Sequence, residues 1–438
     1  MATKKAAKKK KRTAKKKAPA KKAGGASVHV RMYNVGFGDC FLLTIPTAEG
    51  AKRVLVDCGS IAGATHDGAK KMGEIVEQII ENVSEGTPPH IDVVIATHRH
   101  RDHISGFDDE GWASVEVGEV WMPWTEDPDD PEAARIRDIQ NSLAFALSED
   151  FRERKAALAA SDPVAADTME GFELLALNAY SNEEAMATLH EGFKGQQAVR
   201  RRFLPERDGS GKLLRRFESD ALPGVVVHVL GPSRDEEVIR DMEPPAGKSY
   251  LGLAATIDEE GGSRPEPFST DWWLDFEPFG VSSEDRERIR MFSDAPPYVA
   301  AAALDGAVNG TSLMLVLQVG KLHLLLPGDA QWGTWKAALD DPASRRVLER
   351  TSFFKVGHHG SHNATPKEFV EDVFPENVFA MTSTRLMSRW PHIPLQALMD
   401  ALGEKAAKLA RSDDPAGAPK EAYAVRTNEA IELRIPIG

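Results

Sequence analysis

The segment from Thr97 to His103 constrains this chain more than any other. It reads Thr-His-Arg-His-Arg-Asp-His and follows an apolar run, Ile91 to Ala96, which predicts a buried β-strand. Histidine supplies only 13 of the 438 residues, so three imidazoles and a carboxylate within six positions are not expected by chance. Imidazole nitrogens and carboxylate oxygens are the usual ligands of Zn²⁺ and related metals. The motif therefore predicts a metal site at a strand end; a group of surface histidines is the alternative.

The spacing inside the motif predicts two ions. Residues two apart on an extended segment point to the same side, so His98 and His100 can bind one ion. A tight turn would then direct Asp102 and His103 toward a second ion. The elements before the motif are a predicted strand–turn–strand unit, a further strand, an amphipathic helix at 71–83 and the strand at 91–96. This order favours an α/β fold with helices outside the sheets.

The His-x-His-x-Asp-His motif resembles the signature of the metallo-β-lactamase superfamily. Three further stretches resemble one branch of it, the hydrolase domain of the ComEC competence protein family and its soluble relatives. They are "VGFGDCFLL" at 35–43, the Asn309/Ser312 pair followed by Gly328-Asp329, and "KVGHHGS" at 355–361. The resemblance implies an αββα sandwich, two mixed β-sheets with outer helices, formed by residues 26–438. Here it would carry large insertions at about 125–222 and 234–300.

The resemblance also implies a ligand set for two divalent metal ions, with Zn²⁺ expected and Mn²⁺ as the alternative. The implied ligands are His98, His100, Asp102, His103, Asp329, His358 and His392. Asp329 would bridge the ions. His358 is the choice from the His-His pair, with His359 in reserve. His392 occupies the position of a late family histidine, although Trp390-Pro391 replaces the family's aromatic-glycine pair.

Two aspartates are implied to support the metal site without binding the ions. Asp39 lies in the opening hairpin, and Asp57 ends the strand "RVLVD". The resemblance implies that Asp57 supports the ligands by hydrogen bonding. A turn or helix N-cap role is the alternative for Asp57, and both roles are compatible.

The chemistry implied by this ligand set is hydrolysis by a metal-bound hydroxide, formed because the cations stabilise hydroxide near neutral pH. Asp102 and His358 are the expected catalytic residues, and His358 or His359 could act as a general acid. A phosphodiester in a nucleic acid or nucleotide is the expected substrate. The alternatives are a small ester of the phosphocholine or lactone type, and a non-catalytic scaffold that binds polyanions.

Residues 1–25 differ in composition from the rest of the chain. They contain 12 lysines and arginines and no acidic residue, which predicts a disordered tail. Removing these 12 from the chain's 54 basic residues leaves 42 against 67 acidic ones, a net charge of −25. Such a tail can bind nucleic acid by counterion release, or it can fold back on the acidic body. No apolar segment follows it, so it is not expected to be a signal peptide.

The two insertions carry little chemical signal. Residues 131–160 predict one or two helices and 182–202 another, which would place Arg200, Arg201 and Arg202 on a solvated helix face or against phosphates. Trp121 and Trp124 are expected in the core, whereas Trp272 and Trp273 could form a lid or a stacking surface. Insertions of this kind often lie over an active-site mouth.

Two features of the sequence bear on cellular location. No apolar run reaches the roughly 20 residues of a membrane span, so no membrane association is expected. Cys40 and Cys58 both lie in apolar segments and are expected to be reduced, buried thiols. We therefore expect a cytoplasmic protein, with association with the nucleoid as a further possibility if the tail binds DNA.

Overall fold

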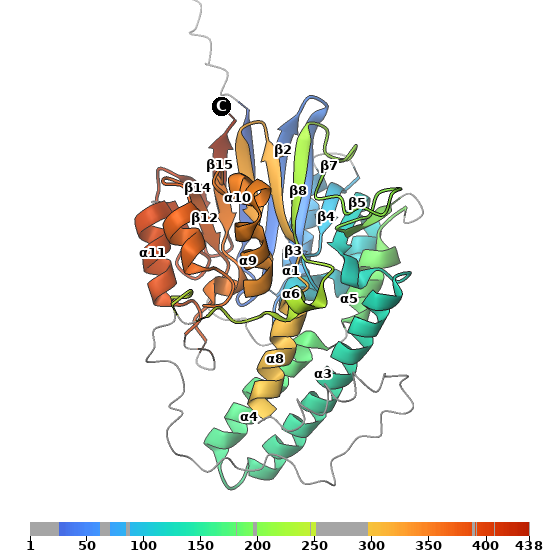
Figure 1. Cartoon of the computed structure of the whole chain (residues 1–438), viewed down its shortest axis with the longest axis vertical. Coiled ribbons are helices and arrows are strands. Elements are labelled where there is room, and N and C mark those ends of the chain that lie inside the picture. Colours follow the sequence, from blue (N-terminus) through green and yellow to red (C-terminus); the bar gives the residue numbers. More distant parts are fainter. Residues whose placement is uncertain are drawn as a thin grey trace, which may run out of the picture.

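The structure is a computed structural model that describes residues 26–438. Within that range it leaves out residues 62–70, 85–87, 181, 196–198, 246, 251–296, 388–389, 391, 407 and 438. The lysine-rich tail and Trp272 and Trp273 therefore lie outside the described residues. The described chain is a mixed α/β structure built on two mixed β-sheets, shown in Figure 1.

The first sheet has eight strands in the order β14-β15-β1-β2-β3-β4-β5-β6. Their bounds are β1 Ser27–Tyr33, β2 Cys40–Thr47, β3 Gly50–Cys58, β4 His90–Ile95, β5 Glu116–Pro123, β6 Arg200–Leu204, β14 Tyr423–Arg426 and β15 Ala430–Pro436. Strands β14 to β3 are antiparallel neighbours, whereas β3, β4, β5 and β6 run parallel. The carboxyl ends of β3 and β4 therefore meet at one edge, where Asp57 and the His motif follow.

The second sheet has seven strands in the order β13-β12-β11-β10-β9-β8-β7. Their bounds are β7 Arg216–Glu218, β8 Val225–Gly231, β9 Met314–Val319, β10 Leu322–Leu326, β11 Phe353–Lys355, β12 Phe379–Thr382 and β13 Lys408–Arg411. Strands β10 to β13 are parallel, so the segments after β10, β11 and β12 also lie at one edge. Those segments carry Asp329, the His358-His359 pair and Ser383.

The hydrophobic core has three layers that follow from the strand pattern. One cluster joins the inner faces of the two sheets, with Val30, Phe41 and Val56 from the first and Leu315 and Phe353 from the second. A second cluster lies between the first sheet and helix α1, Met72–Ser84. A third covers the second sheet with α9 Trp332–Asp340, α10 Pro342–Leu348 and α11 Gln396–Ala406. This layering is consistent with an αββα sandwich.

The part of the insertions that the structure describes is mainly helical. Helices α3 Pro131–Leu158, α4 Pro163–Ala179 and α8 Pro297–Asn309 pack on one another through a separate apolar cluster and extend from one end of the sheets (Figure 1). Asp130 and Asp162 each accept hydrogen bonds at the start of α3 and α4, directly before a proline at the first helical position. The helical prediction for 131–160 is confirmed. No described helix combines the length and the apolar character that crossing a membrane needs.

The helix predicted at 182–202 is wrong in its second half. Only α5 Glu183–Ala187 and a π-helical turn, Thr188–Gly192, are helical, and Arg200–Leu204 forms strand β6 in parallel register with β5. Alternating burial along β6 places Arg202 inside, where its guanidinium pairs with Glu206 and lies over the ring of Phe217. Pairing with an existing sheet edge overrides local helix propensity here.

Other elements agree with the sequence. The predicted hairpin at 28–46 is β1 and β2, the helix at 71–83 is α1, and the strand before the motif is β4. Trp121 and Trp124 are fully buried and donate their indole N–H groups to Glu119 and to the Ser233 carbonyl. Cys40 and Cys58 are free, buried thiols on adjacent strands.

Candidate metal centre

The centre of the site is the short segment after β4. Thr97, His98 and His100 extend the strand, and α2, Arg101–Ile104, begins at once and brings Asp102 and His103 back toward them. All four motif side chains are buried. The Nε2 atom of His98 lies 3.0 Å from Nδ1 of His100. The two rings therefore point toward the same place, as the spacing of His98 and His100 predicts.

Asp57, at the end of β3, holds the segment in place. Its carboxylate accepts hydrogen bonds from the Thr97 backbone N–H at 2.7 Å, the Thr97 hydroxyl at 2.8 Å and His103 Nδ1 at 2.9 Å. This arrangement fixes the His103 ring and directs its Nε2 into the site. Asp57 thus contributes hydrogen bonds to a histidine, as expected.

Asp329 brings the second sheet to the same point. It follows β10 after Gly328, and its Oδ2 lies 3.0 Å from His103 Nε2. The Ser312 hydroxyl accepts a hydrogen bond from the Asp329 backbone N–H at 3.2 Å. Gly328 has a φ of 57°, and a Cβ there would lie 3.0 Å from the Thr97 side chain, so this turn requires glycine. Ser312 and Gly328, both singled out in the sequence, therefore hold the turn that positions Asp329.

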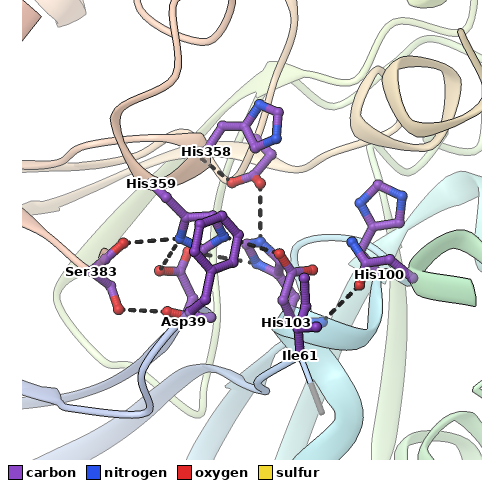
Figure 2. Close-up of polar contacts among 12 residues, drawn as sticks. Asp39, Ile61, His100, His103, His358, His359 and Ser383 are labelled. Atoms are coloured by element: carbon purple, nitrogen blue, oxygen red, sulfur yellow. Dashed lines mark hydrogen bonds and ion pairs between the residues drawn. The ribbon is translucent and has the colours of Figure 1, made fainter. Parts of the chain in front are cut away.

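The two adjacent histidines after β11 have different positions. His359 is fully buried; its Nε2 lies 3.0 Å from Asp102 Oδ2, and its Nδ1 donates to the Ser383 carbonyl at 2.9 Å. The His358 side chain is 15% exposed and its Nδ1 lies 3.2 Å from the Asn363 side-chain oxygen. Figure 2 shows the His359 ring beside His103 and Asp39, with the His358 ring apart from them. The reserve candidate His359, and not the ring of His358, thus joins the buried groups that could hold an ion, while the His358 backbone N–H donates to Asp329 at 2.9 Å.

Three site residues have left-handed backbone conformations. The structure describes four non-glycine residues with positive φ, and three of them are Asp57 at 55°, His358 at 45° and His359 at 53°. Such conformations cost free energy for a residue with a side chain, and they persist where the surroundings impose them. Their concentration at one point marks this cluster as the candidate functional site.

His392 does not join this cluster. Its side chain is exposed, although the neighbouring segment packs on the site: the Leu395 backbone N–H donates to the Gly360 carbonyl at 2.9 Å, and Trp390 lies against Phe37. Phe37 in turn lies 4.3 Å from the His359 ring. The segment expected to supply a ligand thus supplies apolar covering for His359 in this structure.

The donor set fits a metal. Buried His and Asp groups that could hold an ion are His98, His103 and Asp329; Asp102, His103 and His359; and Asp39, Asp57 and His103. The Oδ1 atom of Asp102 is buried without a hydrogen-bond partner. If His98 and His100 carry their protons on the outer nitrogens, two lone pairs face each other at 3.0 Å, an arrangement that only a cation stabilises.

Burial and neighbouring charges shift the pKa values of the site residues in two directions. Burial and the nearby imidazoles hold the pKa of His98 well below its ordinary value, and burial lowers the pKa of His100 to about 4. Burial opposes ionisation of Asp329, but the charge and hydrogen bond of His103 hold its pKa well below the usual range. Burial opposes the charge of His103 and His359, but Asp329 beside His103 and Asp102 beside His359 raise the pKa of each ring, so an ion bound there would displace a proton.

Lys355 is a site residue whose role the sequence reasoning did not identify. It ends β11, is fully buried, and forms ion pairs with Asp39 and, at 3.7 Å, with Asp329. Burial opposes its charge, but these carboxylates raise its pKa above the ordinary value. A lysine inside the apolar run Phe353–Val356 was the signal that could have revealed it.

We expect Lys355→Met to destabilise the metal-free protein by about 3–5 kcal/mol, because removing one partner leaves the buried carboxylates uncompensated. Denaturant unfolding measures the change. Lys336→Met, which removes an exposed lysine paired with Asp340, is the control and should leave the unfolding midpoint close to the wild-type value. Equal midpoints for both variants would contradict the structural role of Lys355.

The helical insertion also reaches the site, which the sequence did not predict residue by residue. From α4, the Asn178 side-chain oxygen accepts a hydrogen bond from the Asp102 backbone N–H at 3.1 Å. From α8, Asp305 lies 3.8 Å from His100 and 3.9 Å from His358. Burial and the charges of Asp102 and Asp329 raise the pKa of Asp305 well above its ordinary value. The sequence feature that could have revealed Asp305 is its position as the single acidic residue in the alanine-rich run 300–307.

Comparison of the chain with protein-family models and with curated proteins found no match. The site is therefore interpreted from its own geometry.

Proposed function

We propose that this chain is a metal-dependent hydrolase of the metallo-β-lactamase fold that binds two divalent ions and cleaves phosphodiester bonds. The observation that supports this most strongly is convergence: His98, His100, Asp102 and His103 from one sheet meet Asp329 and His359 from the other in a buried cluster. The motif resemblance supplies the fold family, and Zn²⁺ is the proposed ion.

In this proposal the protein residues divide into two sets. His98 and His100 would hold one ion, Asp102, His103 and His359 would hold the other, and Asp329 would contribute its carboxylate to the centre. Bound divalent ions supply a water of lowered pKa as nucleophile and stabilise negative charge that develops on the substrate. Asp57, Thr97 and Lys355 orient the ligands and balance their charge.

His358 has a different proposed role from its neighbour. Its ring is partly exposed, its Nδ1 donates a hydrogen bond to the Asn363 side-chain oxygen, and its Nε2 is close to Asp305. It is therefore free to donate a proton to the leaving-group oxygen or a hydrogen bond to the substrate. Asp102 remains a proposed catalytic residue. Its position is fixed by Asn178, which accepts from its backbone N–H, and by His359, whose ring contacts its carboxylate.

The test is metal analysis coupled to a panel of phosphodiesters: single- and double-stranded DNA, RNA and bis(p-nitrophenyl) phosphate. We expect about two bound ions per chain, loss of hydrolysis on chelation, and recovery when Zn²⁺ or Mn²⁺ is restored. Full hydrolysis by protein stripped of both ions would refute the proposal. Activity confined to phosphocholine esters or lactones would replace the substrate class and keep the metal chemistry.

The lysine-rich tail favours a nucleic acid over a small substrate, and it also supports a non-catalytic polyanion-binding scaffold as the second candidate function. We expect deletion of residues 1–25 to weaken hydrolysis of DNA or RNA by roughly tenfold or more at low salt, with a shallower salt dependence, because fewer counterions are released. Hydrolysis of bis(p-nitrophenyl) phosphate should not change.

The matched control for this deletion keeps the tail length and replaces its 12 basic residues with glutamine. This variant should behave like the deletion if charge is responsible. Equal DNA hydrolysis by all three proteins would mean that the tail does not contact the substrate.

A further inference from the structure

The imidazoles of the proposed metal centre share a pattern with one exception. In three of them the nitrogen that faces away from the cluster has a partner: His98 Nδ1 lies 3.2 Å from the Thr97 hydroxyl, His103 Nδ1 lies 2.9 Å from Asp57, and His359 Nδ1 lies 2.9 Å from the Ser383 carbonyl. Such partners fix the tautomer and ring orientation of a metal-binding histidine.

His100 is the exception. Its Nδ1 faces His98, so its outer nitrogen is Nε2, and this atom is buried without a hydrogen-bond partner. A buried, unpaired N–H costs free energy and leaves the ring free to rotate. The recorded acidic neighbour of this atom is Asp305, whose Oδ1 lies 3.8 Å away.

Asp305 is itself held in a defined orientation. It lies in α8, four residues before Asn309, whose side-chain N–H donates to Asp305 Oδ2 at 2.9 Å. Oδ1, the oxygen nearer to His100, accepts no hydrogen bond from the part of the chain that the structure describes. The separation of 3.8 Å exceeds a hydrogen bond by roughly 1 Å, which is within the adjustment that side chains make when a site is filled.

We propose that Asp305, supplied by the helical insertion, is the positioning carboxylate of His100 and accepts its Nε2–H when the metal centre is loaded. This inference rests on the proposed metal binding and adds a role for the insertion: helix α8 completes the set of hydrogen bonds that orient the ligands. Asp305 acts through His100 and does not itself bind an ion, because the nitrogen beside it points away from His98.

The experiment measures Zn²⁺ and Co²⁺ affinity by competition with a chromogenic chelator, together with the visible absorption spectrum of the Co²⁺ form. We expect Asp305→Asn to weaken binding at the His98/His100 ion by about 10- to 100-fold, the usual effect of losing such a partner, and to alter the Co²⁺ spectrum. The control, Asp138→Asn, removes an exposed acid from helix α3, which packs in the same helical cluster as α8, and should leave both readouts unchanged.

A double-mutant cycle with His100→Ala establishes whether Asp305 acts through His100. If it does, Asp305→Asn should cause no further loss of affinity in the His100→Ala background. Additive losses would overturn the inference and indicate direct binding of the ion by Asp305 or a purely structural role. Unchanged affinity in Asp305→Asn would overturn it too, whereas a wild-type chain that binds neither metal would instead refute the proposed function.

Discussion

The Asp329→Ala variant should lose about 10³-fold in phosphodiester hydrolysis and most of its bound metal. Asp329, like His359, brings the second sheet into contact with the His motif, and it lies against His103, Lys355 and the His358 backbone. Its removal would take one carboxylate from both ions, and roughly 4 kcal/mol of lost transition-state stabilisation corresponds to this factor. Steady-state kinetics and metal content per chain are the measurements.

This variant also separates the enzyme from the scaffold. A scaffold would retain nucleic-acid binding and would show no hydrolysis to lose, whereas an enzyme loses turnover while tail-dependent binding persists. Asp138→Ala, on the surface of α3, is the control for loss of an acidic side chain. Wild-type turnover and metal content in Asp329→Ala would contradict the dinuclear site.

His359→Ala and His358→Ala should differ in kind. His359 is buried against Asp102 and Ser383, so its loss should weaken metal binding by about 100-fold or more and reduce hydrolysis accordingly. His358→Ala should retain metal, because its ring lies outside the buried cluster, and should lower turnover by about 10²- to 10⁴-fold, as expected for a lost proton donor.

The control is His362→Ala in the same loop, where the histidine is partly exposed and lies 3.2 Å from Glu243. Metal content and turnover should both remain at wild-type values. Metal loss in His358→Ala together with metal retention in His359→Ala would reverse the assignment of the two histidines.

Local signals predicted the parts of the site that belong to continuous segments. The apolar run before His98 predicted β4, the spacing of His98 and His100 predicted their shared direction, and Gly328-Asp329 was recognised at a strand end. Each of these depends on residues that are close in sequence. The helix predicted across Arg200–Arg202 failed because the deciding contact, with β5, is about 80 residues away.

The site features that the sequence did not predict depend on tertiary structure. The sequence "HHG" does not distinguish His358 from His359. In the folded chain both have left-handed backbone angles, and the His359 ring is buried in the site whereas the His358 ring is partly exposed. His392 has the residue type of a ligand but lies on an exposed part of a segment whose apolar neighbours cover the site. Asn178 on α4, Asp305 on α8 and Lys355 on β11 are distant from the motif in sequence. Their contacts with the site depend on how these elements pack beside it.

The ligands of the proposed centre belong to two different sheets whose inner faces share an apolar core. An ion held between His103 and Asp329 would therefore be a non-covalent cross-link between separate halves of the chain. Because a ligand that binds only the native state stabilises that state by mass action, the melting temperature of this protein would rise with the concentration of free metal. Metal starvation would then lower the amount of folded protein as well as its occupancy.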